Sequence, residues 1–439
     1  MTTERAPHIN VGLIGLGTVG TGVARTLLEK PRVLEERVGA RLVLRRVCDR
    51  NPRRARALRV PPGLITTDAR RILEDPEIQI VVELIGGIHP AKALVLEALR
   101  RGKHVVTANK ALLAEEGQEL FSVADRHAVD LYFEASVGGG IPIIKVLREG
   151  LIANDVDTIL GIVNGTSNYI LTQMRERHLS FAAALGEAQD KGYAERNPTL
   201  DISGMDSAHK LAILALLGFG KAVVPSQIYV EGIQAISQAD IQYAQDFGYV
   251  IKLLAIAKRV DHELELRVHP TLLSREHLLS NVSGVYNAIY VHGDLVGGEL
   301  FYGRGAGQNP TASAVISDIA DLARNLAACV TKRVPHFIRD ARIRRLRSIE
   351  DVESRYYIRC SVIDRPGVLA KITGILGRHH ISIASVLQKE RNAARIVPVV
   401  LMTHEAFERQ MRQALVEIDR LPTVRRASVA IRTEAPRQR

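Results

Sequence analysis

Hydrophobic residues follow two alternating patterns over the first third of the chain. Short runs of β-branched and other apolar residues are separated by stretches in which apolar residues recur with helical spacing. The runs at 43–48, 78–85, 104–107 and 130–133 are predicted to be strands. Because strands that alternate with helices are typical of a parallel α/β sheet, the pattern predicts such a sheet over residues 9–145.

A glycine-rich turn stands at the start of this region. An apolar run ends at Gly15, and Gly17 and Gly20 follow with the spacing Gly-x-Gly-x-x-Gly before an amphipathic helix. Gly15 allows a tight turn, Gly17 lets the backbone approach a pyrophosphate, and Gly20 lets the helix pack closely on the strand. The helix N-terminus then presents N–H groups to the anion. This context favours dinucleotide binding over the alternative, an ordinary βα turn.

Charged residues follow the second predicted strand. Asp49 stands where an acidic residue would bind the ribose hydroxyls of the adenosine, whereas Arg50, with Arg53 and Arg54 close behind, could hold a 2′-phosphate. The pattern leans slightly towards NADP or dual use of NAD and NADP. A simple turn role for Asp49 stays open.

Residues 146–331 mix the two patterns, which predicts an α+β domain. Helices are predicted at 180–191, 206–217 and 239–258, and strands at 158–163, 264–269 and 288–292. Another helix is predicted after Pro310, with Asn309 as its cap. This last helix is long enough to pack back on the first domain.

The C-terminal part of the chain has the pattern of a linker followed by one small α/β module. Residues 332–354 are rich in arginine and lack hydrophobic periodicity, which predicts a linker. Beyond it, over 355–432, the pattern predicts a βαββαβ module. Its elements are a strand at 356–362, a turn at 364–367, a helix at 368–379, strands at 381–387 and 394–402, a helix at 404–420 and a strand at 424–431.

Composition and net charge limit the classes of partner that the chain is expected to bind. With 439 residues, 46% of them hydrophobic and 24% charged, the chain is expected to form several ordinary globular domains. The net charge is +11, but the arginines are scattered and tryptophan is absent, so a nucleic-acid surface is not expected. The positive field could instead steer an anionic substrate and cofactor.

The length of the apolar runs and the composition of the first residues predict where in the cell the protein lies. No run is long enough to span a bilayer, and the first residues contain no apolar signal segment, so we expect a cytoplasmic protein without a membrane partner. The three cysteines, Cys48, Cys329 and Cys360, lack metal-binding spacing. They are predicted to be reduced, buried and structural.

The segment 192–210 gathers the side chains best suited to proton transfer. Glu195, Asp201 and Asp206 precede Lys210 near the start of an apolar helix. Asp206 and Lys210 are four residues apart and therefore share one face of that helix. A lysine beside carboxylates can transfer protons once its surroundings tune its pKa. From these residues alone, however, an exposed ion pair is the stronger interpretation.

A series of short motifs runs in order through nearly the whole chain. They are the turn at 15–20, TANKA at 107–111, EASVGGGIP at 134–142, VNGTSNY at 163–169, the segment 192–210, YGRGAG at 302–307, DRPGVLA at 364–370 and ISI at 381–383. Together they resemble the motifs of monofunctional bacterial homoserine dehydrogenases with a C-terminal ACT domain. That resemblance implies reversible, NAD(P)H-dependent reduction of L-aspartate 4-semialdehyde to L-homoserine, in threonine, methionine and isoleucine biosynthesis.

The resemblance also assigns roles to residues. Lys210 would donate the proton to the aldehyde oxygen, Asp206 would orient it, and Lys110 would lie near the nicotinamide in a role that stays open. Substrate binding is implied for Glu195, which would hold the amino group, and for Asp201 and Thr166. The cofactor-binding residues that it implies are Gly15, Gly17, Thr18, Val19, Gly20, Asp49, Arg50, Thr107, Lys110 and Gly307.

One departure from the family pattern lies beside this pocket. The family usually has Ala-Asp after the glutamate that matches Glu195, whereas here Arg196 and Asn197 follow it. The change adds a positive charge and puts the substrate affinity or the pH profile slightly in doubt.

Two further sites are implied by the resemblance. Glu134, Val137, Gly139 and Ile141 match a monovalent cation site, expected to hold Na⁺ through one carboxylate and several main-chain carbonyls; a glycine-rich hinge is the alternative. In the ACT module, the residues expected at an effector site for the carboxylate of a small amino acid are Asp364, Gly367 and Val368.

The resemblance implies L-threonine as that effector, acting as a feedback inhibitor. The alternative is a dimerising module without a ligand. We expect at least a homodimer through the middle region, and a homotetramer if the ACT modules link dimers.

The predicted fold class is therefore α/β, with three domains. They are a Rossmann NAD(P)-binding domain at 1–145, an α+β catalytic and dimerisation domain at 146–331 and, after the linker at 332–354, the ACT domain at 355–432. A dehydrogenase of another small amino-acid aldehyde and a non-catalytic nucleotide-sensing regulator are the competing functions. The set Lys110, Glu195, Asp206 and Lys210 argues against the regulator.

Overall fold

The structure, a computed structural model, describes residues 6–388 and 396–434, and its chain divides into two compact units. Unit 1 consists of Met1–Ile159, His209–Gln227 and Asn287–Ala341, and unit 2 of Leu160–Ala208, Ile228–Tyr286 and Arg342–Arg439. The chain therefore passes between the units within β7 (Val156–Ile162), α11 (Met205–Phe219) and β11 (Tyr286–Gly293), and again after Gln227 and after Ala341.

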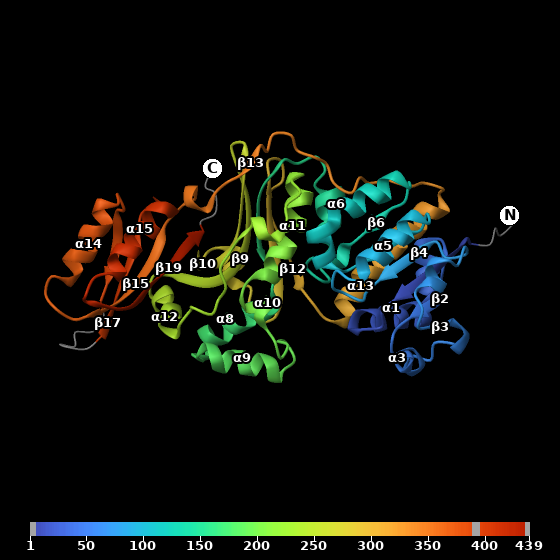
Figure 1. The fold of residues 1–439 in the computed structure, drawn as a ribbon, viewed down its shortest axis with the longest axis horizontal. Coiled ribbons are helices and arrows are strands. Elements are labelled where there is room, and N and C mark those ends of the chain that lie inside the picture. Colours follow the sequence, from blue (N-terminus) through green and yellow to red (C-terminus); the bar gives the residue numbers. More distant parts are fainter. Residues whose placement is uncertain (1–5, 389–395, 435–439) are drawn as a thin grey trace. The chain divides into compact units, whose positions relative to one another are not determined.

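Unit 1 is built on a six-stranded sheet with the order β3-β2-β1-β4-β5-β6 (Figure 1). All neighbouring strands in it are parallel. This is the Rossmann order, in which a dinucleotide binds where the strand order reverses, beside the carboxyl ends of β1 and β4. The strands are β1 (His8–Ile14), β2 (Arg41–Cys48), β3 (Ile65–Thr66), β4 (Ile80–Glu83), β5 (His104–Thr107) and β6 (Leu131–Tyr132).

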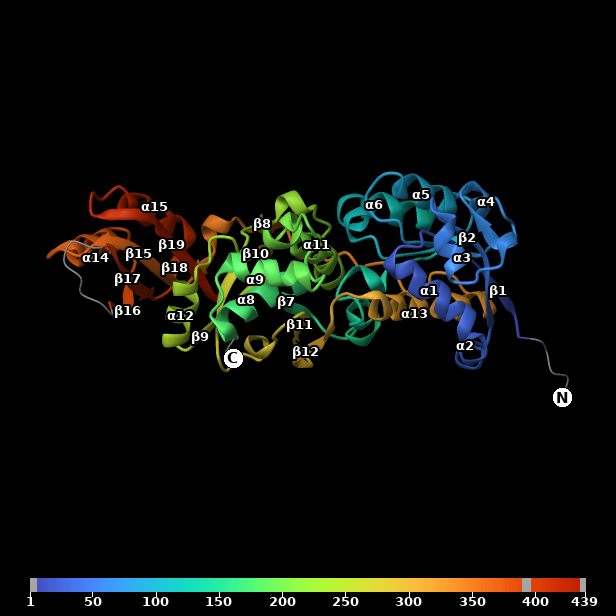
Figure 2. The ribbon, with the colours of Figure 1, turned by 90° about the horizontal axis from the view of Figure 1, so that it is seen from below.

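Helices cover this sheet, and one of them comes from far along the chain. The helix α13 (Gln308–Ala327) lies beside α1 (Thr18–Glu29), and residues of both share one hydrophobic core with β1 (Figure 2). The other helices of this sheet are α2 (Pro31–Val38), α3 (Pro52–Ala57), α4 (Arg70–Leu73), α5 (Ala91–Arg100), α6 (Lys110–Arg126) and α7 (Ile143–Lys145). Unit 1 also contains β12 (Gly297–Arg304), which pairs with β11.

The start of α13 differs from the prediction. The capping residue is Gly307, with a φ of +120°, and not Asn309, which lies inside the first turn. Glycine suits this position because other residues rarely adopt such a φ.

Unit 2 is built around a long antiparallel hairpin. β9 (Tyr249–Val260) and β10 (Glu263–Ser274) pair along their whole length, and β8 (Tyr229–Val230) and β13 (Arg345–Leu346) also pair with β10. The helices beside it are α8 (Gly165–Arg177), α9 (Phe181–Asp190), α10 (Thr199–Ile202) and α12 (Gln238–Asp246).

The C-terminal part of unit 2 is the predicted βαββαβ module. Its four main strands have the order β19-β15-β17-β16, and its two helices share a hydrophobic core with them. The elements are β15 (Tyr356–Ile363), α14 (Val368–Arg378), β16 (Ile383–Leu387), β17 (Ile396–Thr403), α15 (Glu408–Asp419) and β19 (Val424–Glu434). The first residues expected in the strand at 394–402 lie outside the described residues.

The last strand does more than close this module. β19 pairs in parallel with β10, where Arg432 and Glu434 stand opposite Thr271 and Leu273. The sheet of the module is therefore continuous with β10. The predicted linker takes part as well, because β13 pairs with β10 and β14 (Glu353–Ser354) pairs with β18 (Ala406–Phe407).

The predicted helix at 239–258 is wrong in its second half. α12 ends at Asp246, Gly248 follows with a φ of +82°, and Tyr249–Val260 is the strand β9, buried from Val250 to Ala257. A strand that is buried on both faces has a continuous apolar sequence, which periodicity cannot distinguish from a buried helix.

One cysteine also departs from the prediction. Cys48 and Cys360 are buried, but Cys329 is exposed just after the end of α13. Over the described residues, we find no helix with both the length and the apolar character needed to cross a membrane.

Candidate active site

A cleft of about 620 Å³ opens beside the carboxyl ends of β1, β2 and β4 in unit 1. Its walls include Gly15 and Gly17 from the turn after β1, and Asp49 and Arg50 from the end of β2. The loop after β4 forms another part of the wall. The cleft thus lies where the strand order reverses, as expected for a dinucleotide site.

The glycine turn has the shape that its motif predicts. Gly15 has a φ of +100°, and a Cβ atom on it would lie 2.7 Å from the carbonyl oxygen of Leu84. A Cβ atom on Gly20 would lie 1.9 Å from the carbonyl oxygen of Gly15, so only glycine lets α1 start so close to the strand. At Gly17 the corresponding space is open, which leaves room for a pyrophosphate near the backbone.

Asp49 links this turn to the end of β2. Its Oδ2 accepts a hydrogen bond from the backbone N–H of Leu16 at 2.7 Å, and its Oδ1 accepts one from Asn51 at 2.7 Å. The guanidinium of Arg54 lies 3.8 Å from Oδ2, and Arg50 is exposed on the cleft. Each oxygen of Asp49 therefore already supports the loop.

A buried carboxylate that the sequence analysis missed shapes the rest of the cleft. Glu83, at the end of β4, is fully buried and accepts hydrogen bonds from Thr107 Oγ1 at 2.7 Å and from the backbone N–H of Ile85 at 2.8 Å. A charge in such a place must be hydrogen-bonded, and these bonds fix Thr107 and the loop after β4. An acidic residue closing the apolar strand at 80–83 was the available signal.

Lys110 is the first residue of α6. Asn109 caps that helix by accepting from the backbone N–H of Leu112 at 3.2 Å, and it donates to the carbonyl oxygen of Gly87 at 2.6 Å. The half-buried Lys110 is therefore placed at a helix N-terminus that is tied to the loop after β4.

Unit 2 contains the predicted substrate residues. Asn164 donates from Nδ2 to Asp201 Oδ1 at 2.7 Å and to Asp206 Oδ2 at 2.8 Å. Its Oδ1 accepts from the backbone N–H of Ser167 at 2.8 Å and so caps α8. Because the cap fixes the orientation of the amide, Asn164 holds two carboxylates of the predicted site at one point.

The sequence analysis did not single out Asn164. Its signal was an asparagine directly before a helix, in the motif at 163–169. The next predicted residue, Thr166, donates from its hydroxyl to the carbonyl oxygen of Tyr193 at 2.7 Å. It thereby connects the start of α8 to the loop that carries Glu195.

The pair on α11 is buried. Asp206 is 5% exposed and Lys210 is 8% exposed, so the interpretation as an exposed ion pair is wrong. Glu195, in contrast, is exposed in the loop between α9 and α10, where its carbonyl oxygen accepts from Gln189 Nε2 at 3.2 Å. Among the described residues, the hydrogen bonds around Asn164 do not include Glu195.

The predicted cation residues form one loop of unit 1. Glu134 is buried, and its carboxylate accepts from the backbone N–H groups of Ile144 at 2.9 Å and Lys145 at 2.8 Å. Burial raises the pKa of Glu134 to about 7. Val137 and Ile141 follow in the same loop, together with Gly139, and all three are buried.

A second carboxylate lies behind this loop. Asp318 of α13 accepts from the backbone N–H of Glu134 at 2.8 Å, and burial together with the charge of Glu134 raises the pKa of Asp318 well above its usual range. The loop thus brings two acidic side chains together away from water, and both ionise less readily than they would in water.

The predicted effector residues lie at the start of α14. Gly367 caps the helix with a φ of +87°, the half-buried Asp364 precedes it, and Val368 is 5% exposed and belongs to the core of the module.

Comparison with known families covers most of the chain. Residues 15–134 match the family described as "Homoserine dehydrogenase, NAD binding domain", residues 142–320 match "Homoserine dehydrogenase" and residues 356–422 match "ACT domain". The chain belongs to the homoserine dehydrogenase family. Members of this family are oxidoreductases of amino-acid biosynthesis that use a nicotinamide dinucleotide, and the cleft beside β1 and β4 fits that use.

Individual relatives agree over their full length. A homoserine dehydrogenase from Neisseria gonorrhoeae is 43% identical over 430 residues, which are 97% of this chain and 99% of that protein. The crystal structure of a homoserine dehydrogenase from Thiobacillus denitrificans is 46% identical with a TM-score of 0.91, covering 98% of this chain and 99% of that one. A hyperthermophilic archaeal homoserine dehydrogenase in complex with NADPH is 27% identical with a TM-score of 0.61 and covers 72% of this chain and 97% of that one.

Proposed function

We propose that this homoserine dehydrogenase interconverts L-aspartate 4-semialdehyde and L-homoserine for threonine, methionine and isoleucine biosynthesis, with Asp201, Asp206 and Lys210 in the substrate site. The observation that carries the proposal is the shared amide of Asn164, which holds Asp201 and Asp206 together. Lys210 stands one helical turn beyond Asp206, and both are buried. Steady-state oxidation of L-homoserine by the full chain tests it.

Each residue has one task in this proposal. The nicotinamide cofactor, when bound in the cleft, supplies the hydride for the reduction and accepts it in the reverse direction. Lys210 donates a proton to the aldehyde oxygen, and Asp206 orients the lysine. Lys110, at the N-terminus of α6, supplies a positive charge for the reaction.

Substrate binding in the proposal falls to three residues. Asp201 is held by the amide of Asn164 and by the hydroxyl of Ser167, which donates to its carbonyl oxygen at 2.9 Å, and Thr166 lies between these two residues in the first turn of α8. Glu195, exposed in the neighbouring loop, attracts the amino group of homoserine.

We further propose that Arg50 makes the cofactor site accept NADP at least as well as NAD. Both oxygens of Asp49 accept backbone hydrogen bonds, whereas the exposed Arg50 lines the cleft. A guanidinium there can form planar, charge-assisted hydrogen bonds to a 2′-phosphate.

Replacing Arg50 with alanine should therefore weaken binding of NADP by about 10-fold and leave that of NAD nearly unchanged, because a hydrogen bond to a charged group contributes roughly 1.5–3 kcal/mol. Titration of each cofactor into the protein, followed by calorimetry, measures both dissociation constants. Arg25→Ala, which removes the same charge from the exposed face of α1, is the matched control. Equal losses for the two cofactors would show that Arg50 does not discriminate between them.

A monovalent cation, Na⁺, is proposed for the loop after Glu134. The buried carboxylate of Glu134 and the main-chain carbonyls of Val137, Gly139 and Ile141 provide the hard oxygen ligands that such an ion takes. Burial disfavours the charged form of Glu134, and a bound cation would stabilise that form.

L-threonine is proposed as the ligand of the ACT module, with feedback inhibition as its effect. The support is the family of the module and the turn from the half-buried Asp364 to the exposed Gly367, where the N–H groups that begin α14 suit a carboxylate. Removal of everything after Ser354 is an unsuitable test, because β19 would leave β10 with it.

A point substitution tests the effector site more cleanly. In Asp364→Ala we expect L-threonine to inhibit at a concentration about 10-fold higher than in the wild type, because the variant loses a hydrogen bond to the charged amino group of threonine, and such a bond contributes roughly 1.5–3 kcal/mol. The uninhibited rate should not change. Glu405→Ala removes an exposed carboxylate of the same module and should keep the wild-type response. If threonine does not inhibit the wild type, the module has another role.

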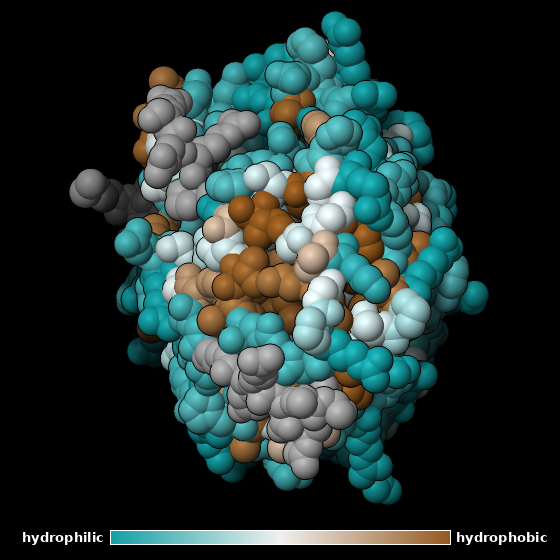
Figure 3. Space-filling model, turned by 90° about the vertical axis from the view of Figure 1, so that its left-hand side faces the viewer, coloured by the Kyte–Doolittle hydropathy of each residue, from teal (hydrophilic) through white to brown (hydrophobic). Residues whose placement is uncertain are grey.

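Oligomer formation is also proposed, as a homodimer or a homotetramer. The surface of the C-terminal module shows a patch of hydrophobic side chains within a hydrophilic surround (Figure 3). Large hydrophobic residues of the module that stay exposed in one chain are Leu369, Val386, Ile396 and Val416. Exposed patches of this kind favour contacts between chains.

A further inference from the structure

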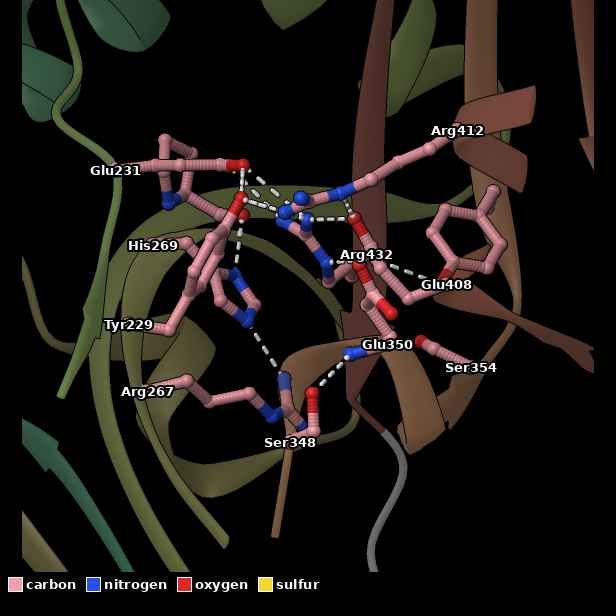
Figure 4. Close-up of polar contacts among 12 residues, drawn as sticks. Tyr229, Glu231, Arg267, His269, Ser348, Glu350, Ser354, Glu408, Arg412 and Arg432 are labelled. Atoms are coloured by element: carbon pink, nitrogen blue, oxygen red, sulfur yellow. Dashed lines mark hydrogen bonds and ion pairs between the residues drawn. The ribbon is translucent and has the colours of Figure 1, made fainter. Parts of the chain in front are cut away.

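Buried charges fill the place where the C-terminal module meets β10 (Figure 4). Arg432 of β19 is 4% exposed, and Glu408, the first residue of α15, is 3% exposed. Arg432 Nε donates to Glu408 Oε2 at 2.7 Å. This ion pair fixes the last strand of the module to its second helix.

The same guanidinium reaches out of the module. Arg432 Nη1 donates to Glu231 Oε2 at 2.9 Å, and Nη2 donates to Glu231 Oε1 and to the hydroxyl of Tyr229, both at 3.2 Å. Arg412 of α15 donates to that hydroxyl at 2.9 Å. The segment 229–233 is therefore tied to the module by two arginines.

This segment is held on β10 and lies against the substrate residues. The backbone N–H of Glu231 donates to the carbonyl oxygen of Val268 at 2.7 Å, and that of Ile233 donates to Ile202 at 2.9 Å. A Cβ atom on Gly232 would lie 2.3 Å from the carbonyl oxygen of Ile202, so the two backbones touch. Ile202 is the residue after Asp201.

A second contact repeats this arrangement nearer to α11. Gly204, two residues before Asp206, has a φ of +87°, and a Cβ atom on it would lie 3.0 Å from Val230 Cγ1. Close backbone packing of this kind leaves little freedom for one segment to move without the other. A shift of Glu231 is thus transmitted to the residues that flank Asp201 and Asp206.

We propose that Glu231 is a positioning residue, which lets Arg432 of the C-terminal module hold the 201–206 segment in the geometry that binds substrate. The inference rests on the proposed function, because it takes Asp201 and Asp206 as parts of the substrate site. Arg432 is buried, the side chain of Glu231 is 38% exposed, and two charge-assisted hydrogen bonds between them fix the position of Glu231 relative to β19. The contact of Arg432 with Glu231 and Tyr229 is therefore the physical link by which the state of the module sets the affinity for homoserine.

The test replaces Glu231 with glutamine, which keeps the shape of the side chain and leaves the pair between Arg432 and Glu408 in place. We expect the KM for L-homoserine to rise about 5-fold, while kcat and the dissociation constant of the cofactor stay within about 2-fold, since residues along a coupling path change the coupled affinity by such factors. Tyr229→Phe, a smaller change at the same contact, should raise the KM in the same direction.

Two comparisons separate positioning from general loosening of the fold. Glu417→Gln removes a carboxylate of α15 that pairs with His379 at 3.1 Å inside the module and away from the segment, and it should leave the KM unchanged. In the background of Asp201→Asn, Glu231→Gln should add little to the KM, because its effect passes through the segment that carries Asp201.

The results of these variants decide whether Glu231 positions the 201–206 segment. An unchanged KM in both Glu231→Gln and Tyr229→Phe overturns the inference, and so do an equal rise in Glu417→Gln or full additivity with Asp201→Asn. If the wild type does not oxidise homoserine at all, the proposed function itself fails and the inference falls with it.

Discussion

Replacing Lys210 with alanine should lower kcat for homoserine oxidation by about 10² to 10⁴-fold, the usual contribution of a general acid or base. Lys210 is buried in α11 one turn after Asp206, and a shorter side chain at that position cannot reach a substrate oxygen. The cofactor should still bind, because the cleft beside β1 and β4 is built without Lys210. Steady-state turnover of L-homoserine measures kcat, and titration of the cofactor into the protein measures its binding.

A second variant separates proton transfer from electrostatics. Lys210→Arg keeps a positive charge, but a guanidinium does not release its proton near neutral pH, so its kcat should stay low. Lys30→Ala, at the exposed end of α1, controls for the loss of one lysine. An alanine variant with more than about a third of the wild-type kcat would remove Lys210 from the proposed role.

Replacing Arg267 with methionine should strongly destabilise unit 2. Arg267 is 3% exposed and donates to Glu265 Oε1 at 2.6 Å and to Glu434 Oε2 at 2.9 Å. Its removal leaves two carboxylates without this partner in a buried site, and breaking a buried ion pair on one side typically costs about 3–5 kcal/mol. The midpoint of thermal unfolding should fall by roughly 10 °C at neutral pH.

The loss should depend on pH. Burial alone would raise the pKa of Glu434, but the charges of Lys258 and Arg267 outweigh it, so the pKa in the folded protein is lowered. A carboxylate of this kind stabilises the fold above its unfolded pKa of about 4.3, and that stabilisation is lost as the pH falls. The difference between wild type and Arg267→Met should therefore be largest near pH 7 and shrink below about pH 4.

Arg345→Met is the matched control for this prediction. Arg345 of β13 pairs with Glu263 of β10, the strand that carries Arg267, but the side chain of Arg345 is 74% exposed. Its loss should therefore change the midpoint little. Equal midpoints for the wild type and Arg267→Met at pH 7 would show that the buried ion pairs of Arg267 with Glu265 and Glu434 do not stabilise unit 2.

Local sequence patterns predicted the elements whose cause is local. The glycine turn at 15–20 has one steric solution, since Gly20 must approach the carbonyl oxygen of Gly15, and its place in the fold followed from the motif. The strand at 104–107 and the βαββαβ order of the C-terminal module followed from alternation and turn residues in the same way.

Features that depend on distant partners were not predictable. Nothing near Asn164 shows that its amide reaches Asp201, 37 positions later, and nothing near Arg432 shows that it pairs with Glu231, 201 positions earlier. The strand β9 was mistaken for a helix because its burial on both faces depends on neighbouring elements. Long-range hydrogen bonds and burial decide these cases, and both exist only in the folded chain.

The most direct test of the central claim is steady-state oxidation of L-homoserine by the full chain, with NAD and NADP each supplied as the oxidised cofactor and their reduction followed by absorbance. The account predicts saturable, homoserine-dependent reduction of at least one cofactor between about pH 7 and pH 10, and its loss in Lys210→Ala. Absence of homoserine-dependent reduction with both cofactors throughout that range, by protein that still binds the cofactor, would contradict it.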